Sequence, residues 1–210
     1  MQLKNHYATR GQVTTDRLVP AWFAPVVVLA LAGAMLLTAA LAKADAPTLA
    51  DRVAALVPGF GSKKVELVDA QEFGAAVDTA CKHDRECAVR LTAMAVAESA
   101  LSRDVSLGVY TEHQGDSYRD KDGTVKHRAW SLWQLHSNAH NASVFGSTEL
   151  LTQARAAKAA QLGALAECRA FREVSSEVGM WRVLSGRGCL YHYSGEEKRM
   201  QLLAKIRGRL

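Results

Sequence analysis

The feature that most constrains this chain is an uninterrupted uncharged segment near its start. Residues 21–42 contain 22 consecutive residues without a charged side chain. A helix of about 20 apolar residues spans a bilayer, whereas buried core helices seldom run this long without a charge. We therefore expect the segment to direct export, either as a secretory signal peptide or as a membrane anchor.

The residues on either side of this segment predict its orientation in the membrane. They do not decide whether it is cleaved. Residues 1–18 are polar and carry Lys4, Arg10 and Arg17 against one acid, Asp16, which favours an N-terminus that stays in the cytoplasm. Small residues at positions 42, 44 and 46 offer two small-x-small cleavage sites. Both outcomes, a cleaved signal peptide and an uncleaved anchor, are compatible with this pattern.

These observations divide the chain into four parts. Residues 1–18 are a polar leader, residues 19–43 a signal peptide or transmembrane anchor, and residues 44–64 a linker with one short helix capped by Thr48. Residues 65–210 then form one globular domain, since a chain of this length supports about one core.

The four cysteines agree with export. Cys81, Cys87, Cys168 and Cys189 all follow the apolar segment, and an even count in an exported protein points to disulfides. Proximity in sequence favours the pairs Cys81–Cys87 and Cys168–Cys189. No Cys-x-x-Cys is present, so a zinc site built on these cysteines is disfavoured.

Charge limits the classes of partner. The net charge is +5, and residues after 46 contribute only +3 of it, without a block of Lys or Arg. Nucleic-acid binding is therefore not expected. A mildly basic protein suits a polyanionic partner such as a cell-wall polymer, and the membrane is a second partner if the N-terminal segment is retained.

The pattern of the domain predicts a mostly helical α+β fold with a small β region. Asp69 and Asp84 are placed to cap two helices that end near residues 79 and 99. The dipeptide Asp122-Gly123 favours a hairpin turn, and β-like pieces are expected at 105–111 and 124–128. Further helical regions are expected at 130–135, 147–168, 178–184 and 196–210.

Glu98 is the most informative single residue. Leu91, Met94 and Ala95 form an apolar stripe on the second of these helices, and Glu98 follows Leu91 by seven residues on the same face. A carboxylate at the end of a core-facing stripe loses part of its hydration, which raises its pKa. A raised pKa suits a general acid near neutral pH, as in the known example of lysozyme.

Three short motifs resemble the lysozyme-like domain of soluble lytic transglycosylases and goose-type lysozymes. They are Glu98-Ser99 at a helix end, Ser131-Leu-Trp-Gln134 after the β region, and Tyr191-His-Tyr193-Ser-Gly195 before the last helix. The resemblance covers about residues 65–210. It departs at Ser131, where the family has glycine; a serine fits that turn if the backbone there is not left-handed.

The resemblance implies an enzyme that cleaves the β-1,4 bond between N-acetylmuramic acid and N-acetylglucosamine in peptidoglycan strands. It implies that Glu98 is the catalytic acid and base, that Gln134 lines the substrate cleft, and that Tyr191 or Tyr193 lies near the carboxylate. We expect Ser99, Ser131 and Trp133 beside them at the substrate. The face of Trp133 can stack on a sugar ring, and a role as a core aromatic is the alternative. The lytic reaction uses one carboxylate and gives 1,6-anhydromuramic ends. No cofactor and no metal is expected.

Other readings remain open from the sequence. A lysozyme-type hydrolase, including a phage lysis or virion-associated muramidase, needs a second acid; Asp104 and Glu112 are the first candidates, and Asp116, Asp120 and Asp122 also lie in the β region. A non-catalytic glycan-binding module would leave Glu98 as a structural ion-pair partner, for example of Arg90 or Arg103.

Overall fold

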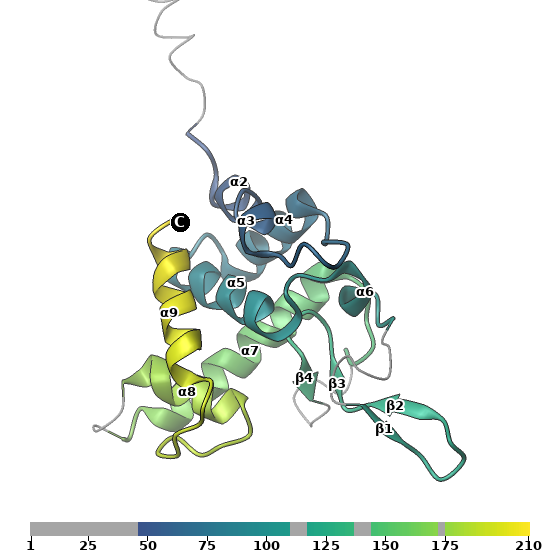
Figure 1. The fold of residues 1–210 in the computed structure, drawn as a ribbon. Helices are drawn as coiled ribbons and strands as arrows, with labels where there is room; N and C mark the ends of the chain where they lie inside the picture. The colour runs from purple at the N-terminus through teal and green to yellow at the C-terminus, as the bar shows by residue number, and fades with distance from the viewer. Residues whose placement is uncertain (1–45, 110–116, 137–143, 172–174) are drawn as a thin grey trace, which may run out of the picture. The chain divides into compact units, whose positions relative to one another are not determined.

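A computed structural model describes residues 46–109, 117–136, 144–171 and 175–210 (Figure 1). Within these ranges no helix has the length and apolar character needed to cross a bilayer. The predicted signal or anchor at 19–43 lies outside them, as do Glu112 and Asp116. The compact unit extends from Pro47 to Leu210.

Residues 47–64 belong to the domain, so the predicted linker is wrong for this part of the chain. Helix α2, Leu49–Ala54, begins at a capping box between Thr48 and Asp51, and α3, Val57–Phe60, follows it. Val53 and Val57 are buried in the main core. Burial on this scale stabilises the domain, which a solvated linker would not do.

A close approach of two helices explains how α2 joins the core. Helix α2 packs along α4, Ala70–Cys81. At the contact, Gly74 of α4 faces the backbone of α2, and a Cβ atom at Gly74 would lie 2.3 Å from the carbonyl oxygen of Ala50. Only glycine allows the two backbones to come this close.

Both predicted aspartate caps are confirmed. The Asp69 side chain accepts a hydrogen bond from the backbone N–H of Glu72 at 2.8 Å at the start of α4. The Asp84 side chain accepts one from Cys87 at 2.7 Å at the start of α5, Arg85–Ser99. These bonds satisfy backbone donors that have no partner within the helix.

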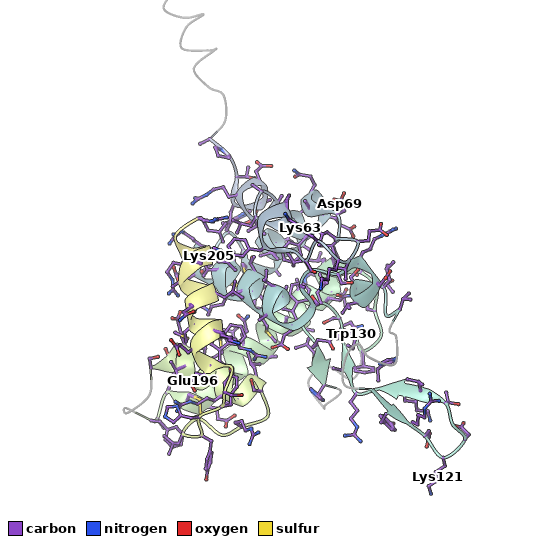
Figure 2. The ribbon with its side chains drawn as sticks, in the orientation of Figure 1. Lys63, Asp69, Lys121, Trp130, Glu196 and Lys205 are labelled. Atoms are coloured by element: carbon purple, nitrogen blue, oxygen red, sulfur yellow. A yellow bond between two sulfur atoms is a disulfide. The ribbon has the colours of Figure 1, made fainter. Side chains whose placement is uncertain are left out.

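The β region contains the predicted hairpin and a second small sheet that was not predicted. Strands β1, Ser117–Arg119, and β2, Val125–His127, form the expected antiparallel hairpin, and Figure 2 shows Lys121 at its far end. Strands β3, Ala129–Trp130, and β4, Leu135–His136, pair as a second two-stranded sheet. The predicted helical region at 130–135 is therefore a β-turn-β unit, in which two residues have positive φ.

The extended segment predicted at 105–111 is also wrong where the structure describes it. Arg103–Ser106 form a short helix, α6. A segment this short shows neither the period of a helix nor that of a strand. An apolar residue such as Val105 is therefore compatible with both. Val105 and Ser106 are both buried.

Three helices complete the domain. They are α7, Leu150–Cys168, α8, Ser176–Leu184, and α9, Glu196–Arg207. Helix α7 packs against α4 and α8, while α9 lies alongside α5 (Figure 1). Leu203 and Ile206 of α9 are fully buried. The described chain is mostly helical with two small antiparallel sheets, which confirms the α+β class.

Both predicted disulfides are present. Cys81 is bonded to Cys87, and Cys168 to Cys189. The first closes the turn between α4 and α5, and the second ties the end of α7 to the segment after α8. Two disulfides fit an oxidising, exported environment.

Candidate active site

Glu98 lies in the last turn of α5, at the end of the predicted stripe. Leu91 and Ala95 below it are fully buried, and Met94 is 3% exposed. The Glu98 side chain itself is 21% exposed. The helical period thus brings one carboxylate to the boundary between core and solvent, as expected from the sequence.

The partner of Glu98 is Arg199 of α9. A guanidinium nitrogen of Arg199 lies 2.6 Å from a Glu98 carboxylate oxygen, and the two side chains are equally exposed. Neither Arg90 nor Arg103, the partners considered from the sequence, has this role; Arg103 pairs with Glu66 at 2.6 Å. The pair joins two helices that are packed side by side.

Arg199 is itself held from three sides. It donates a hydrogen bond to the Ser185 hydroxyl at 2.9 Å. Its guanidinium carbon lies 5.1 Å from the ring centre of Trp181 and 5.4 Å from that of Tyr193, which is within cation–π range. These contacts fix the cation beside the carboxylate.

Two opposing effects set the ionisation of Glu98. Burial raises its pKa above the usual value of 4.5, while the positive charges of Arg199 and His136 lower it. The effect of burial is the larger, so the pKa is raised overall. The protonated form of this carboxyl is therefore favoured relative to an ordinary glutamate.

Glu98 faces a cleft of about 1300 Å³. One wall is a face of α7 made of small residues, and the others come from the end of α5, the β3–β4 unit, the end of α8 and α9. Pockets for small molecules are about 300 to 1,000 Å³, so this cleft has room for several units of a polymer. Among the described residues, the charged or titratable ones that line it are Glu98, His136, Glu167 and Arg199.

The turn between β3 and β4 has a left-handed backbone at Ser131. Its φ is +73°, and that of Gln134 is +48°. The condition under which a serine would replace the family's glycine without strain is therefore not met. The turn is held instead by hydrogen bonds: the Ser131 hydroxyl accepts from the backbone N–H of Trp133 at 3.2 Å, and the Gln134 amide donates to the Ser131 carbonyl at 2.9 Å.

A buried glutamine connects this turn to its surroundings. Gln153 of α7 is fully buried, and its side-chain oxygen accepts a hydrogen bond from the backbone N–H of Leu132 at 3.2 Å. Its side-chain nitrogen donates to the carbonyl oxygens of Ser106 and Ser147. One side chain thus satisfies backbone groups from three segments, which is what a buried polar group requires.

Trp133 supports the cleft from below. Its side chain is 0% exposed, stacks on Phe73 with ring centres 6.0 Å apart, and donates a hydrogen bond to the Leu91 carbonyl at 2.8 Å. A sugar ring needs an accessible aromatic face, so the expected stacking role does not apply to Trp133. Ser131 is also fully buried. Gln134 is half-buried and lines the cleft.

The other predicted site residues lie at different distances from Glu98. Tyr193 packs against Arg199 and so lies one layer behind Glu98. Tyr191 is 70% exposed and does not line the cleft. The Ser99 hydroxyl donates to the Ala95 carbonyl at 2.8 Å, within its own helix. Of the two tyrosines, Tyr193 is the one associated with the carboxylate.

A second carboxylate lines the cleft, and the sequence reasoning did not find it. Glu167 lies in the last turn of α7 and is exposed. The acids proposed from the β region lie elsewhere where they are described: Asp104 is exposed and does not line the cleft, and Asp120 and Asp122 belong to the β1–β2 connection. No local motif marks Glu167, because only the folding of α7 across the domain brings it to the cleft.

Among the residues that the structure describes, no group of three His, Cys, Asp or Glu side chains could hold a metal ion. His136 and His140 are four residues apart, a spacing that zinc ligands can have, but His140 lies outside the described residues. No protein-family model, curated protein or solved structure matches this chain.

Proposed function

We propose that this protein is an exported, periplasmic-side enzyme that cleaves the β-1,4 glycosidic bond of peptidoglycan strands as a lytic transglycosylase. The observation that carries the proposal is the position of Glu98: a partly buried carboxyl with a raised pKa on the wall of a cleft large enough for a polymer. General acid catalysis at neutral pH needs such a group.

The chemistry uses the two protonation states of one side chain. Protonated Glu98 gives its proton to the glycosidic oxygen as the bond to the anomeric carbon breaks and an oxocarbenium-like state forms. The resulting carboxylate then removes the proton of the muramic acid C6 hydroxyl. That oxygen bonds to the anomeric carbon, which gives the 1,6-anhydro end and returns the proton to Glu98.

Glu167 supports a second candidate, a lysozyme-type hydrolase. Two-carboxylate hydrolysis requires an acid on each side of the scissile bond, and Glu167 lines the same cleft as Glu98. In this alternative Glu167 would activate water or form the covalent intermediate. The two reactions differ in their products, which are reducing ends for hydrolysis and anhydro ends for the lytic route.

Digestion of purified sacculi, followed by mass spectrometry of the released fragments, tests the proposal. The Glu98→Gln variant should lose about 10²- to 10⁴-fold in rate, the usual contribution of a general acid. Glu86→Gln is the matched control, because Glu86 also lies on α5 and pairs with an arginine of α9, Arg207 at 2.9 Å, but does not line the cleft. It should retain activity.

The outcomes separate the candidates. Anhydro ends released by the wild type and lost with Glu98→Gln support the lytic reaction. If the wild type releases reducing ends, and both Glu98→Gln and Glu167→Gln abolish them, the enzyme is a hydrolase. A wild-type protein that binds sacculi without releasing fragments would overturn the proposal in favour of a glycan-binding module. A Glu98→Gln protein that releases fragments as fast as the wild type would overturn the assignment of Glu98 as the catalytic acid.

A further inference from the structure

Arg199 is the arginine among the described residues that line the cleft. Among the described lining residues, the other charged or titratable groups are two carboxyls, Glu98 and Glu167, and one imidazole, His136. The Arg199 side chain is 21% exposed, so ligands in the cleft have access to it. Its contacts with Ser185 and two aromatic rings hold it in place without Glu98.

We propose that Arg199 binds a carboxylate carried by the glycan, which takes the place of the Glu98 carboxylate on the guanidinium when the polymer enters the cleft. The inference rests on the proposed function, since it names the substrate feature that the same site selects. It makes the enzyme selective for anionic glycans over neutral ones.

The chemistry of the guanidinium allows this exchange. Arginine has five N–H donors in a planar fork that matches a carboxylate. The structure uses one nitrogen on Glu98 and the other terminal nitrogen on Ser185. An incoming carboxylate therefore competes with Glu98 for a cation that does not need to move.

The exchange has a consequence for Glu98. The charged groups that favour its ionised form are Arg199 from α9 and His136 from β4, while burial opposes it. Glu167 of α7, the other acid of the cleft, adds no positive charge. When a substrate carboxylate neutralises Arg199, the pKa of Glu98 rises further, and Glu98 takes a proton from water. Glu98 is thus in its protonated, acidic form when an anionic strand is bound.

Two parts of a peptidoglycan strand could supply the carboxylate. One is the free lactyl group of a muramic acid without its peptide, and the other is a carboxylate of the peptide stem. Three ligands distinguish them: neutral chitin oligosaccharides, glycan strands stripped of peptide, and strands that keep their peptides.

Binding of these three ligands, measured by calorimetry, tests the inference without requiring cleavage. In the Glu98→Gln protein, Arg199 no longer has an ionised partner, so it should bind a carboxylated strand about ten- to a hundredfold more tightly than a neutral one, as expected for a hydrogen bond between charged groups. Adding Arg199→Gln should abolish the difference. The carboxylated ligand that loses affinity identifies the source.

The matched control is Arg207→Gln in the Glu98→Gln protein. Arg207 lies on the same helix and also pairs with a glutamate of α5, but does not line the cleft, so the preference should remain. Equal binding of neutral and carboxylated ligands, a preference that survives Arg199→Gln, or no binding of any glycan would overturn the inference. A preference that depends on Arg199 in a protein that cleaves no glycan would retain the inference and reject the proposed enzyme.

Discussion

The Glu98 carboxylate and the Arg199 guanidinium lie 2.6 Å apart, yet the pKa of Glu98 is raised. An exposed ion pair of this geometry would lower the pKa of the acid. Here the loss of hydration at the end of the α5 stripe outweighs the attraction of two positive groups. Burial at this position therefore makes ionisation of Glu98 less favourable than in water in spite of the ion pair, and perturbed carboxyls of this kind are typical of functional sites.

The first prediction concerns stability and pH. Because the folded protein binds the Glu98 proton more tightly than the unfolded chain, the contribution of Glu98 to stability is fully present below the ordinary glutamate pKa of 4.5. It is lost as pH rises through the folded pKa. Glutamine cannot ionise, so a glutamine at position 98 does not lose stability as the pH rises. We expect Glu98→Gln to be at least as stable as the wild type at pH 7, with the difference shrinking below about pH 4.5.

Urea unfolding at a series of pH values measures this difference. The Glu86→Gln protein serves as control, since Glu86 has lost its hydration to a smaller degree, with a side chain 44% exposed. If Glu98→Gln is markedly less stable than the wild type at pH 7, the ion pair with Arg199 outweighs burial and the sign of the pKa shift is wrong.

Local rules predicted the parts of the fold that depend on neighbouring residues. The stripe that ends at Glu98, the caps at Asp69 and Asp84, and the hairpin at Asp122-Gly123 each follow from spacings of a few residues. The disulfide pairs followed from proximity in sequence. Each of these features depends on residues that are close in sequence, so local sequence patterns are enough to predict it.

The partners of Glu98 depend on packing between distant segments. Arg199 comes from the last helix and Glu167 from the end of α7, and no spacing rule connects either with Glu98. The burial of Trp133 depends in the same way on a distant segment, because its ring stacks on Phe73 of α4. The short helix α6 was predicted as a strand, because four residues are too few to show the hydrophobic period of a helix.

The second prediction concerns the left-handed turn at Ser131. Its φ of +73° costs a non-glycine residue about 1 kcal/mol, and its hydroxyl accepts a hydrogen bond from Trp133. Ser131→Ala keeps the strain and loses the bond, so it should destabilise the protein by about 1 to 2 kcal/mol. Ser131→Gly relieves the strain and should be about 1 kcal/mol more stable than Ser131→Ala. Equal stability of the two variants in urea unfolding would argue against a left-handed Ser131.

The third prediction compares two helical glycines. A Cβ at Gly74 would lie 2.3 Å from the Ala50 carbonyl, whereas one at Gly163 of α7 would have no atom within 4 Å. Gly74→Ala should force α2 away and cost about 1 to 3 kcal/mol. Gly163→Ala should instead stabilise the protein by about 0.5 to 1 kcal/mol, through helix propensity. Thermal unfolding of both variants checks the opposite signs, and a neutral Gly74→Ala would mean that α2 does not pack this closely.

The fourth prediction assigns different roles to the two disulfides. Cys168–Cys189 joins residues 21 apart and Cys81–Cys87 residues 6 apart, so loop-closure entropy gives about 3 and about 2 kcal/mol respectively. Replacing each pair by serines should show this order in urea unfolding.

Only the longer loop is connected to the cleft. The Cys189 carbonyl accepts a hydrogen bond at 2.9 Å from Arg182, which is buried on α8, and the loop contains Ser185, the residue that holds Arg199. Removing Cys168–Cys189 frees this loop and should reduce the release of fragments from sacculi at temperatures where the protein remains folded. Removing Cys81–Cys87, which closes a turn between α4 and α5, should leave that release unchanged. Loss of activity from the shorter bridge alone would show that the segment after α8 does not position the site.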